Sequence, residues 1–480
     1  MRPWLAAILL MLIGVTAASE VKSRSVPPDL LIRNARLWDG IGSEVKPHVS
    51  ILVRSGRIAK IGDIQPMPRV PVLDVGGDTV LPGLIDGHVH VSLNPGGQQR
   101  SDTTAESLRL RHQHLRAYLA CGVTTVLDTG ITVTDAKEVN AWLAAGKPGP
   151  QVLMLMPALT TPHGYATLAN MGQPFVGVAS AQDIEDRFAE SRGLPVMGVK
   201  VFMESGFGPF STLPVHDLVV REAIVQAAAK RHLPIYVHAF VEADQNLALN
   251  MGAHTLVHAG FTEKLPSAEF IQRLARSGSY VTSTIAVQDA LLIGFHPERL
   301  DDPLLRLTVP EIELKTAADP QSRRGLTRQS MVIMLPQWIP KFLYAPLARL
   351  LATEDKMSGW RSNALRTVGL MHAAKVPIVM GSDSGNWPII PYEFHGPTSL
   401  REIELLGEAG LKPDEALAAA TRVAAAMLGK SGDIGTVEVG KRADMVVVRG
   451  DPLHDLRALR NIQWTIHNGV SRTPRQWMQE

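Results

Sequence analysis

The sequence contains almost no cysteine and carries almost no net charge. Its single cysteine, Cys121, excludes an intramolecular disulfide, and a lipid-modified N-terminus is not expected because no cysteine follows the N-terminal apolar run. Lys and Arg number 48 against 46 Asp and Glu, a formal charge of +2, which gives no reason to expect a nucleic-acid surface or a polyanionic substrate. With 45% hydrophobic and 20% charged residues, the composition also argues against a disordered or fibrous chain.

The N-terminal residues have the pattern of a secretory signal. Met1 and Arg2 precede an apolar run over residues 5–15, and small residues follow it. The run is too short to span a bilayer comfortably, so we expect cleavage near Ala18 rather than a permanent anchor. The pattern therefore predicts a signal peptide over residues 1–19 and an exported protein, either periplasmic or secreted.

The longest part of the chain, residues 82–429, alternates buried strand patterns with helix-compatible sequence. Such alternation indicates a parallel sheet with crossover helices, and eight strand patterns favour a closed (β/α)8 TIM barrel over an open sheet. The eight patterns are LIDGHVHV, VTTVLDTG, QVLMLMPAL, VMGVKVFM, LPIYVHAF, HTLVHAG, YVTSTIAV and VPIVMGSDSG.

Two β-rich segments flank the barrel region. Short strand patterns separated by Gly, Asp and Pro occupy residues 28–81, and similar patterns return over residues 430–480. We expect the two segments to combine into one small β-sandwich domain. The predicted fold class is therefore α/β, a (β/α)8 barrel with a composite β-sandwich domain.

One interval of the barrel region is too long for a single crossover helix. Residues 288–356 are predicted to hold an insertion whose apolar centre contains prolines at 336, 340 and 346. Trp338, Phe342 and Tyr344 either form a lid over the site, pack against the barrel wall, or touch a membrane surface. A cap or packing role is favoured over membrane contact because no basic polar face is evident.

Histidines two apart at the end of the first barrel strand give the first chemical signal. His88 and His90 point to the same side of a strand, and two imidazole nitrogens at one spot suit a zinc-like cation. The pair alone is weak, because 16 histidines in 480 residues give roughly 0.5 such pairs by chance. A second pair, His112 and His114, lies in a helical stretch, where residues two apart face different directions, and we interpret these two as surface histidines.

Other polar residues at strand ends strengthen the signal from His88 and His90. His238, His258 and Asp383 each close a strand pattern, where a barrel carries its active site. Lys200 lies inside an apolar strand, where an unpaired ammonium is costly. Two interpretations of Lys200 stay open: an ion pair with a nearby carboxylate, or an amine that burial has made reactive towards carbon dioxide, giving a carbamate that bridges two cations.

These residues resemble the amidohydrolase superfamily, within it the prolidase-like and imidazolonepropionase-like branch. The resemblance covers nearly all of the mature chain. It rests on the Lys200 strand and on LPGLIDGHVH, AYLACGVTTVLDTG, YVHA, LVHAG, GSDSG, LREIELLGEAGLKPDEALAAATRVAAAMLG and DIGTVEVGKRADMVVVRGDP.

The resemblance implies a centre of two divalent metal ions, for which zinc is expected. It implies that one metal is bound by His88, His90 and Asp383 and the other by His238 and His258, with carboxylated Lys200 and a hydroxide bridging them. Two cations lower the pKa of bound water towards about 7. Asp383 would accept the proton of that water and return it to the leaving group.

The predicted function is hydrolysis of an amide bond in a small substrate, such as a dipeptide or an N-acyl amino acid. Alternatives are a lactonase, esterase or phosphotriesterase at the same centre, and a one-metal enzyme of the imidazolonepropionase or deaminase kind. A non-catalytic relative is least favoured because the ligand set is intact. The expected partners are the small-molecule substrate and further copies of the chain, and no nucleic acid is expected.

Three further residues are candidates for substrate binding. His163 follows the third strand and His395 follows the eighth, so each either reaches the site from its loop or is an ordinary loop histidine. Tyr236 shares strand parity with His238 and either contacts substrate or packs inside the barrel.

Overall fold

The computed structural model describes residues 28–91, 104–168, 175–206, 213–260, 264–319, 335, 338–351, 353–386 and 392–479. The predicted signal peptide over residues 1–19 lies outside the described residues, as do parts of the predicted insertion. Within the described residues, no helix is both long and apolar enough to cross a membrane.

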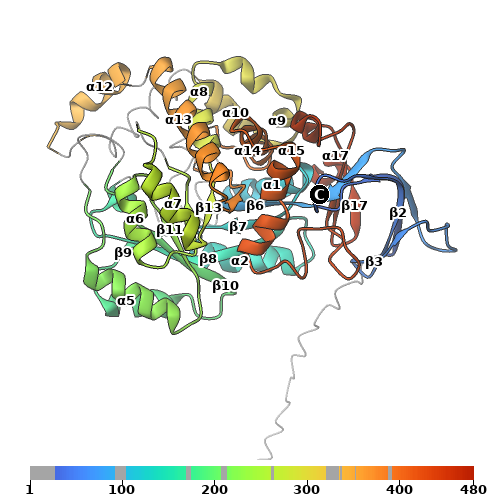
Figure 1. The fold of residues 1–480 in the computed structure, drawn as a ribbon, viewed down its shortest axis with the longest axis horizontal. Helices are drawn as coiled ribbons and strands as arrows, with labels where there is room; N and C mark the ends of the chain where they lie inside the picture. The colour runs from blue at the N-terminus through green and yellow to red at the C-terminus, as the bar shows by residue number, and fades with distance from the viewer. Residues whose placement is uncertain are drawn as a thin grey trace, which may run out of the picture.

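A parallel barrel occupies the centre of the molecule, as the sequence predicted (Figure 1). Each of the eight strand patterns contains one of its strands. They are β6 (Leu84–Val89), β7 (Val123–Asp128), β8 (Gln151–Thr160), β10 (Val196–Phe202), β11 (Ile235–His238), β12 (Thr255–Val257), β13 (Tyr280–Thr282) and β14 (Ile378–Val379), with the short β9 (Val176–Gly177) paired to β8.

Hydrogen bonds between the first and last barrel strands close the barrel. Gly87 N donates to Met380 O at 2.9 Å, and Asp383 N donates to His88 O at 2.9 Å. A parallel bridge joins Val89 to Ser384. The two segments that carry His88 and Asp383 are therefore neighbours although they are far apart in the sequence.

Helices connect the barrel strands and cover their outer face, and an apolar cluster fills the space between helices and strands. Several helices begin at a side chain that caps the first turn, for example Thr104, Asp217 and Ser267. The helices are α1 (Ala105–Ala120), α2 (Val133–Ala144), α3 (Tyr165–Leu168), α4 (Ala181–Glu190), α5 (Leu218–Ala229), α6 (Glu242–Asn250), α7 (Ala268–Ser277), α13 (Glu354–Ala373), α14 (Pro397–Glu408), α15 (Pro413–Ala419) and α16 (Arg422–Met427).

The two terminal segments form one separate sheet, which lies beside the barrel on the right of Figure 1. All eight of its strands are joined by hydrogen bonds into a single sheet, and its hydrophobic core combines residues from both segments. The strands are β1 (Leu30–Leu37), β2 (Lys46–Arg54), β3 (Arg57–Gly62), β4 (Val72–Asp74), β5 (Thr79–Pro82), β15 (Met445–Val448), β16 (Ile462–His467) and β17 (Val470–Arg472), followed by α17 (Pro474–Met478) after the turn η4 (Leu456–Arg460).

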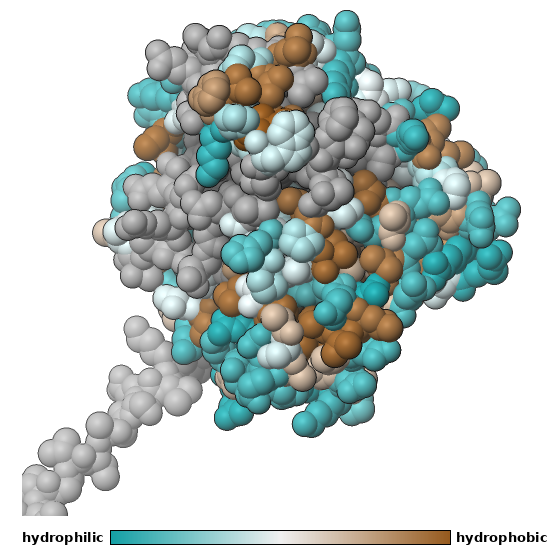
Figure 2. All heavy atoms as spheres, turned by 90° about the vertical axis from the view of Figure 1, so that its left-hand side faces the viewer, coloured by the Kyte–Doolittle hydropathy of each residue, from teal (hydrophilic) through white to brown (hydrophobic). Residues whose placement is uncertain are grey.

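Several short helices lie between β13 and α13, where the sequence predicted an insertion. In its last part Trp338 and Phe342 are 81% and 76% exposed, whereas Tyr344 is buried. The space-filling view of the side that carries α12 shows hydrophobic groups at the surface among hydrophilic ones (Figure 2). The described helices are α8 (Ala286–Ile293), η2 (Pro297–Asp301), α9 (Pro303–Thr308), α10 (Glu311–Ala318), η3 (Lys341–Leu343) and α12 (Tyr344–Leu351).

Candidate metal centre

The six residues predicted to hold the metals all lie in barrel strands or at their C-terminal ends. The C-terminal ends of the strands of a barrel open at one mouth, so these side chains meet there. None is more than 6% exposed. The six are His88 from β6, His90 directly after β6, Lys200 from β10, His238 from β11, His258 after β12 and Asp383 after β14.

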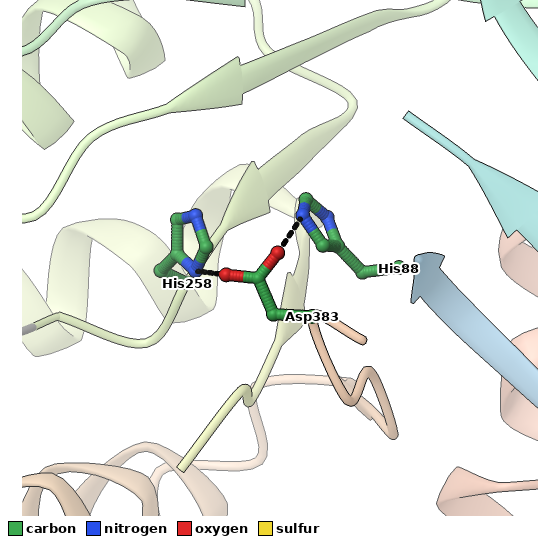
Figure 3. A group of neighbouring side chains, drawn as sticks. All are labelled: His88, His258 and Asp383. Atoms are coloured by element: carbon green, nitrogen blue, oxygen red, sulfur yellow. Dashed lines mark ion pairs between the residues drawn. The ribbon is translucent and has the colours of Figure 1, made fainter. Parts of the chain in front are cut away.

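One group of donor atoms surrounds a carboxylate oxygen of Asp383. Its Oδ1 lies 3.0 Å from His88 Nε2 and 3.1 Å from His90 Nε2. Figure 3 shows Asp383 between the rings of His88 and His258. Two imidazole nitrogens and one carboxylate oxygen at this spacing are suited to a zinc-like cation.

A second group of donors lies on the other side of Asp383. His258 Nε2 lies 3.0 Å from His238 Nδ1, and His258 Nδ1 lies 4.0 Å from Asp383 Oδ2. The ligand atoms of His88, His258 and Asp383 all fall within 4.8 Å of one another. The aspartate is therefore placed to serve both groups.

The buried Lys200 amine lies within the electrostatic reach of both groups. Burial lowers the pKa of Lys200 to about 7, although Asp383 and Asp128 oppose the change. Its charge in turn acts on His88, His238 and His258. Neither Asp383 nor Asp128 forms an ion pair with Lys200 within the described part of the chain, so the ion-pair interpretation finds no support there.

The protonation states of the other donors also suit metal binding. Burial lowers the pKa of His88 to about 3 and that of His238 and His258 well below the ordinary value, so these rings are neutral at pH 7. Burial opposes ionisation of Asp383, but the nearby His88 and His90 hold its pKa well below the usual range. Neutral imidazoles and an ionised carboxylate are the forms that bind divalent metals.

The backbone is strained at the same place. His258, Thr284 and Asp383 have φ angles of 77°, 46° and 58°, in the left-handed region that residues other than glycine rarely adopt. Such strain costs on the order of 1–3 kcal/mol per residue and gathers at functional sites. The surrounding hydrogen bonds maintain this conformation, which indicates that the positions of these side chains matter.

Buried carboxylates fix the segments that carry the ligands. Asp86 accepts hydrogen bonds from His88 N at 3.2 Å, from Ser382 N at 3.0 Å and from Ser399 Oγ at 2.6 Å, and so joins both closing segments of the barrel to α14. Glu402 of α14 accepts from Ile285 N at 3.0 Å, from Ala286 N at 2.6 Å and from the Ser283 hydroxyl. Our sequence interpretation missed both, although Asp86 shares strand parity with His88.

Several side chains that contact the ligand rings were also missed. Thr284 Oγ1 lies 2.7 Å from His258 Nδ1, which orients that ring. Phe240 stacks on His258 at 4.4 Å between ring centres, and Tyr165 stacks on His238 at 4.9 Å. Phe240 lies two residues after His238, just beyond the end of β11, and this spacing is a signal that was available in the sequence.

The three residues predicted to contact substrate lie in three different environments. His163 lies on an exposed turn after β8. Tyr236 belongs to an interior cluster with Leu155, Val257 and residues of α16, one layer deeper in the barrel than His238, so its ring packs there and does not join the histidines. His395 is buried, and Gly385, next to the Asp383 loop, approaches its ring so closely that a Cβ there would lie 2.9 Å from it.

The interpretation of His114 as a surface histidine was wrong. His114 is only 3% exposed. It stacks on His395 at 4.2 Å between ring centres, and its Nε2 lies 2.7 Å from Glu313 of α10. The helical periodicity of α1 directs His114 towards the interior of the molecule. Its buried contacts could not be predicted from the spacing of the two histidines, because the partners are distant in the sequence. His112 has a different partner, since its Nε2 lies 2.6 Å from Glu138 of α2.

The donor set fits a metal centre. Within the described residues His88 Nδ1, His90 Nδ1 and His238 Nε2 have no hydrogen-bond partner, although they are buried. Fold and donors together define a barrel hydrolase of the metal-assisted class.

The chain is similar to known proteins over most of its length. The model of the amidohydrolase family matches residues 79–471, and this chain belongs to that family. A dihydroorotase from Pediococcus pentosaceus is 25% identical over 322 residues, which are 62% of this chain and 68% of that protein. The chain spans about half of a second dihydroorotase, from Bacillus cytotoxicus, with 26% identity over 49% of this chain and 46% of that protein.

Solved structures share the fold over nearly the whole chain. A Xaa-Pro dipeptidase with methionine bound in its active site has a TM-score of 0.68 and 21% identity, over 93% of this chain and 100% of that chain. A prolidase complexed with N-methylphosphonate-L-proline has a TM-score of 0.67 and 19% identity, over 93% and 99%. The family makes this protein a hydrolase that acts on carbon–nitrogen bonds.

Proposed function

We propose that this protein is an exported, two-metal hydrolase that cleaves an amide bond in a small substrate such as a dipeptide or an N-acyl amino acid. The observation that carries the proposal is the convergence of His88, His90, His238, His258, Lys200 and Asp383, all buried, at one mouth of the barrel. Similarity to a Xaa-Pro dipeptidase and a prolidase supports the choice of an amide. Export rests on the N-terminal signal pattern alone.

We assign one metal ion to each of the two groups of donors. His88, His90 and Asp383 would hold one ion, and His238 and His258 the other, with zinc as the expected metal. Lys200, whose pKa is about 7, would be carboxylated by carbon dioxide and shared between them. Bound divalent cations would supply Lewis-acid chemistry, polarising the scissile carbonyl and making a water molecule more acidic.

Asp383 is assigned the proton transfer. It is ionised, because His88 and His90 hold its pKa low against the effect of burial, and its two oxygens face different donor groups. An ionised carboxylate in this position accepts a proton from the attacking water at the carboxylate oxygen and delivers it to the leaving nitrogen. Phe240 and Tyr165, which cover the rings of His258 and His238, keep bulk water from those faces of the site.

The experiment combines metal counting with a substrate panel. The purified protein is expected to contain two metal ions per chain and to hydrolyse dipeptides or N-acyl amino acids in preference to lactones, esters and phosphotriesters. One metal per chain with full activity would favour the imidazolonepropionase-like alternative. Preferred hydrolysis of lactones or phosphotriesters would overturn the amide assignment, because the same donors serve those bonds as well.

A further inference from the structure

Glu393 is a buried carboxylate beside the metal centre that the proposed reaction does not use. It lies in the segment before α14, next to the loop that carries Asp383: Gly385 N donates to Glu393 O at 3.1 Å, and Ser384 Oγ donates to Phe394 O at 3.2 Å. The neighbours of Glu393, Tyr392 and Phe394, pack into an apolar cluster with α8, α9 and α10. The carboxylate acts electrostatically on Asp383 and on Tyr165, which places it on the side of the centre.

Unlike the other buried carboxylates of the region, Glu393 accepts no well-formed hydrogen bond from the described residues. It is 5% exposed, it forms no ion pair with any described residue, and the Asn386 side chain is the one described hydrogen-bond donor that acts on its carboxylate, at a geometry too poor for a regular hydrogen bond. Asp86 and Glu402 each accept three hydrogen bonds, and Glu204 accepts from Gly206 N and Phe240 N at 2.9 Å each. A buried carboxylate with no cation beside it is costly to ionise, and a cation that is not part of the chain would supply the missing ion pair.

The charged groups around Glu393 also favour a positively charged ligand. Tyr165, whose ring stacks on His238, has Glu204, Asp383 and Glu393 as its electrostatic neighbours. The buried Lys200 amine interacts electrostatically with Asp383 and Asp128. Burial and Asp383 raise the pKa of Glu393 well above its ordinary value, although the Asn386 side chain favours the ionised form. A positively charged ligand beside Glu393 would oppose this rise and favour the ionised carboxylate.

We propose that Glu393 binds a protonated amine of the substrate, so that the substrate is a small amide with a free ammonium group, such as a dipeptide with an unblocked N-terminus. This inference rests on the proposed amide hydrolysis and narrows it, because N-acyl amino acids carry no such ammonium. The Glu393 carboxylate and the ammonium would form a buried ion pair in which each group supplies the partner that the other lacks. Glu393 is thus assigned to specificity and not to bond cleavage.

The test compares substrates that differ only at the amine. Each dipeptide of the panel is assayed beside its N-acetylated form, with the wild-type holoenzyme and with Glu393→Gln, which removes the charge and keeps the shape. We expect wild type to prefer the free amine by at least tenfold in kcat/KM. Glu393→Gln is expected to lose about 10- to 100-fold on the free amine, as when one partner of a buried charge pair is removed, with little change on the acetylated form.

Control measurements separate this inference from the general function. Glu311→Gln removes the same charge at an exposed position of α10 and is expected to leave the preference unchanged. Inhibition of wild type by butylamine, compared with butanol, tests the amine site without any variant, and stronger inhibition by the amine is expected. If no amide is cleaved, the proposed function fails. If amides are cleaved without preference for the free amine, or if the variant loses metal or slows both forms equally, the role of Glu393 is refuted while the function stands.

Discussion

Replacing Lys200 by alanine tests whether the buried amine contributes to the metal centre. At pH 7 a lysine with the ordinary pKa of 10.5 is neutral in roughly one molecule in 3000, whereas Lys200, with a pKa of about 7, is neutral in about half. The neutral amine is the form that reacts with carbon dioxide, so burial favours carbamate formation by about three orders of magnitude. Without this ligand, Lys200→Ala is expected to lose metal and at least about 100-fold in turnover.

Three measurements check this expectation. Metal content per chain should fall in Lys200→Ala but not in Lys60→Ala, which removes an exposed lysine of the terminal sheet. A short carboxylic acid such as propionate should restore part of the activity by taking the place of the carbamate. In wild type the neutral fraction of the amine rises from about one tenth at pH 6 to about nine tenths at pH 8, so carbon-13 carbamate signal and metal loading should rise over this interval. A variant that keeps two metals and full activity without added acid would refute the carbamate assignment.

Three other substitutions test further parts of the structure. Asp383→Asn should lower kcat by about 10²- to 10⁴-fold with an unchanged circular dichroism spectrum, since an amide cannot accept the proton; high residual activity would contradict this role. Asp289→Ala should lower the free energy of unfolding by about 3–5 kcal/mol in denaturant titrations, because Asp289 is buried and pairs with Arg361 at 2.7 Å and Arg401 at 3.0 Å; a loss below about 1 kcal/mol would show that the pairs contribute little. Burial opposes the ionisation of Asp289, but Arg401 and Arg299 keep its pKa low, so this contribution is present above about pH 4 and disappears as the pH falls further. Joint replacement of Trp338 and Phe342 by serine should leave thermal unfolding nearly unchanged, because both are exposed, and should weaken the preference for bulky apolar substrates; unchanged selectivity would exclude the lid hypothesis.

The barrel and its six polar residues were predictable because both depend on local sequence signals. Each strand is a short apolar run, and in a parallel barrel the residue that follows such a run lies at the active-site mouth. Asp383 and His258, which follow their strands, could therefore be assigned to this mouth without any knowledge of distances, whereas Lys200 was singled out by its charge inside an apolar strand. The joining of the two terminal segments into one sheet was predictable from their shared pattern of short strands and turns.

The contacts across the barrel were not predictable, because they join segments far apart in the sequence. The stacking of His114 on His395 pairs a helix after the first strand with the loop after the last. Glu393 lies in a stretch whose sequence suggests an ordinary loop, and only its burial without an ion pair or a well-formed hydrogen bond among the described residues distinguishes it. Strand parity placed Tyr236 in the barrel interior, where the structure has it. Parity carries no information on depth along the barrel axis, so it could not show that Tyr236 lies one layer below His238.

Several features of the metal centre lower the stability of the folded chain, and hydrogen bonds around the centre offset this loss. Imidazole nitrogens of His88, His90 and His238 are buried without partners in the described structure, and His258 and Asp383 have strained backbone conformations. Each feature destabilises the folded chain, and together they would open the site unless the segments that bear them were held from outside. Asp86 and Glu402 do so, because five of their hydrogen bonds connect β6, α14 and the segments that follow β13 and β14. The free energy that these bonds contribute keeps the donors arranged for metal ions and substrate, whose binding would in turn offset the cost.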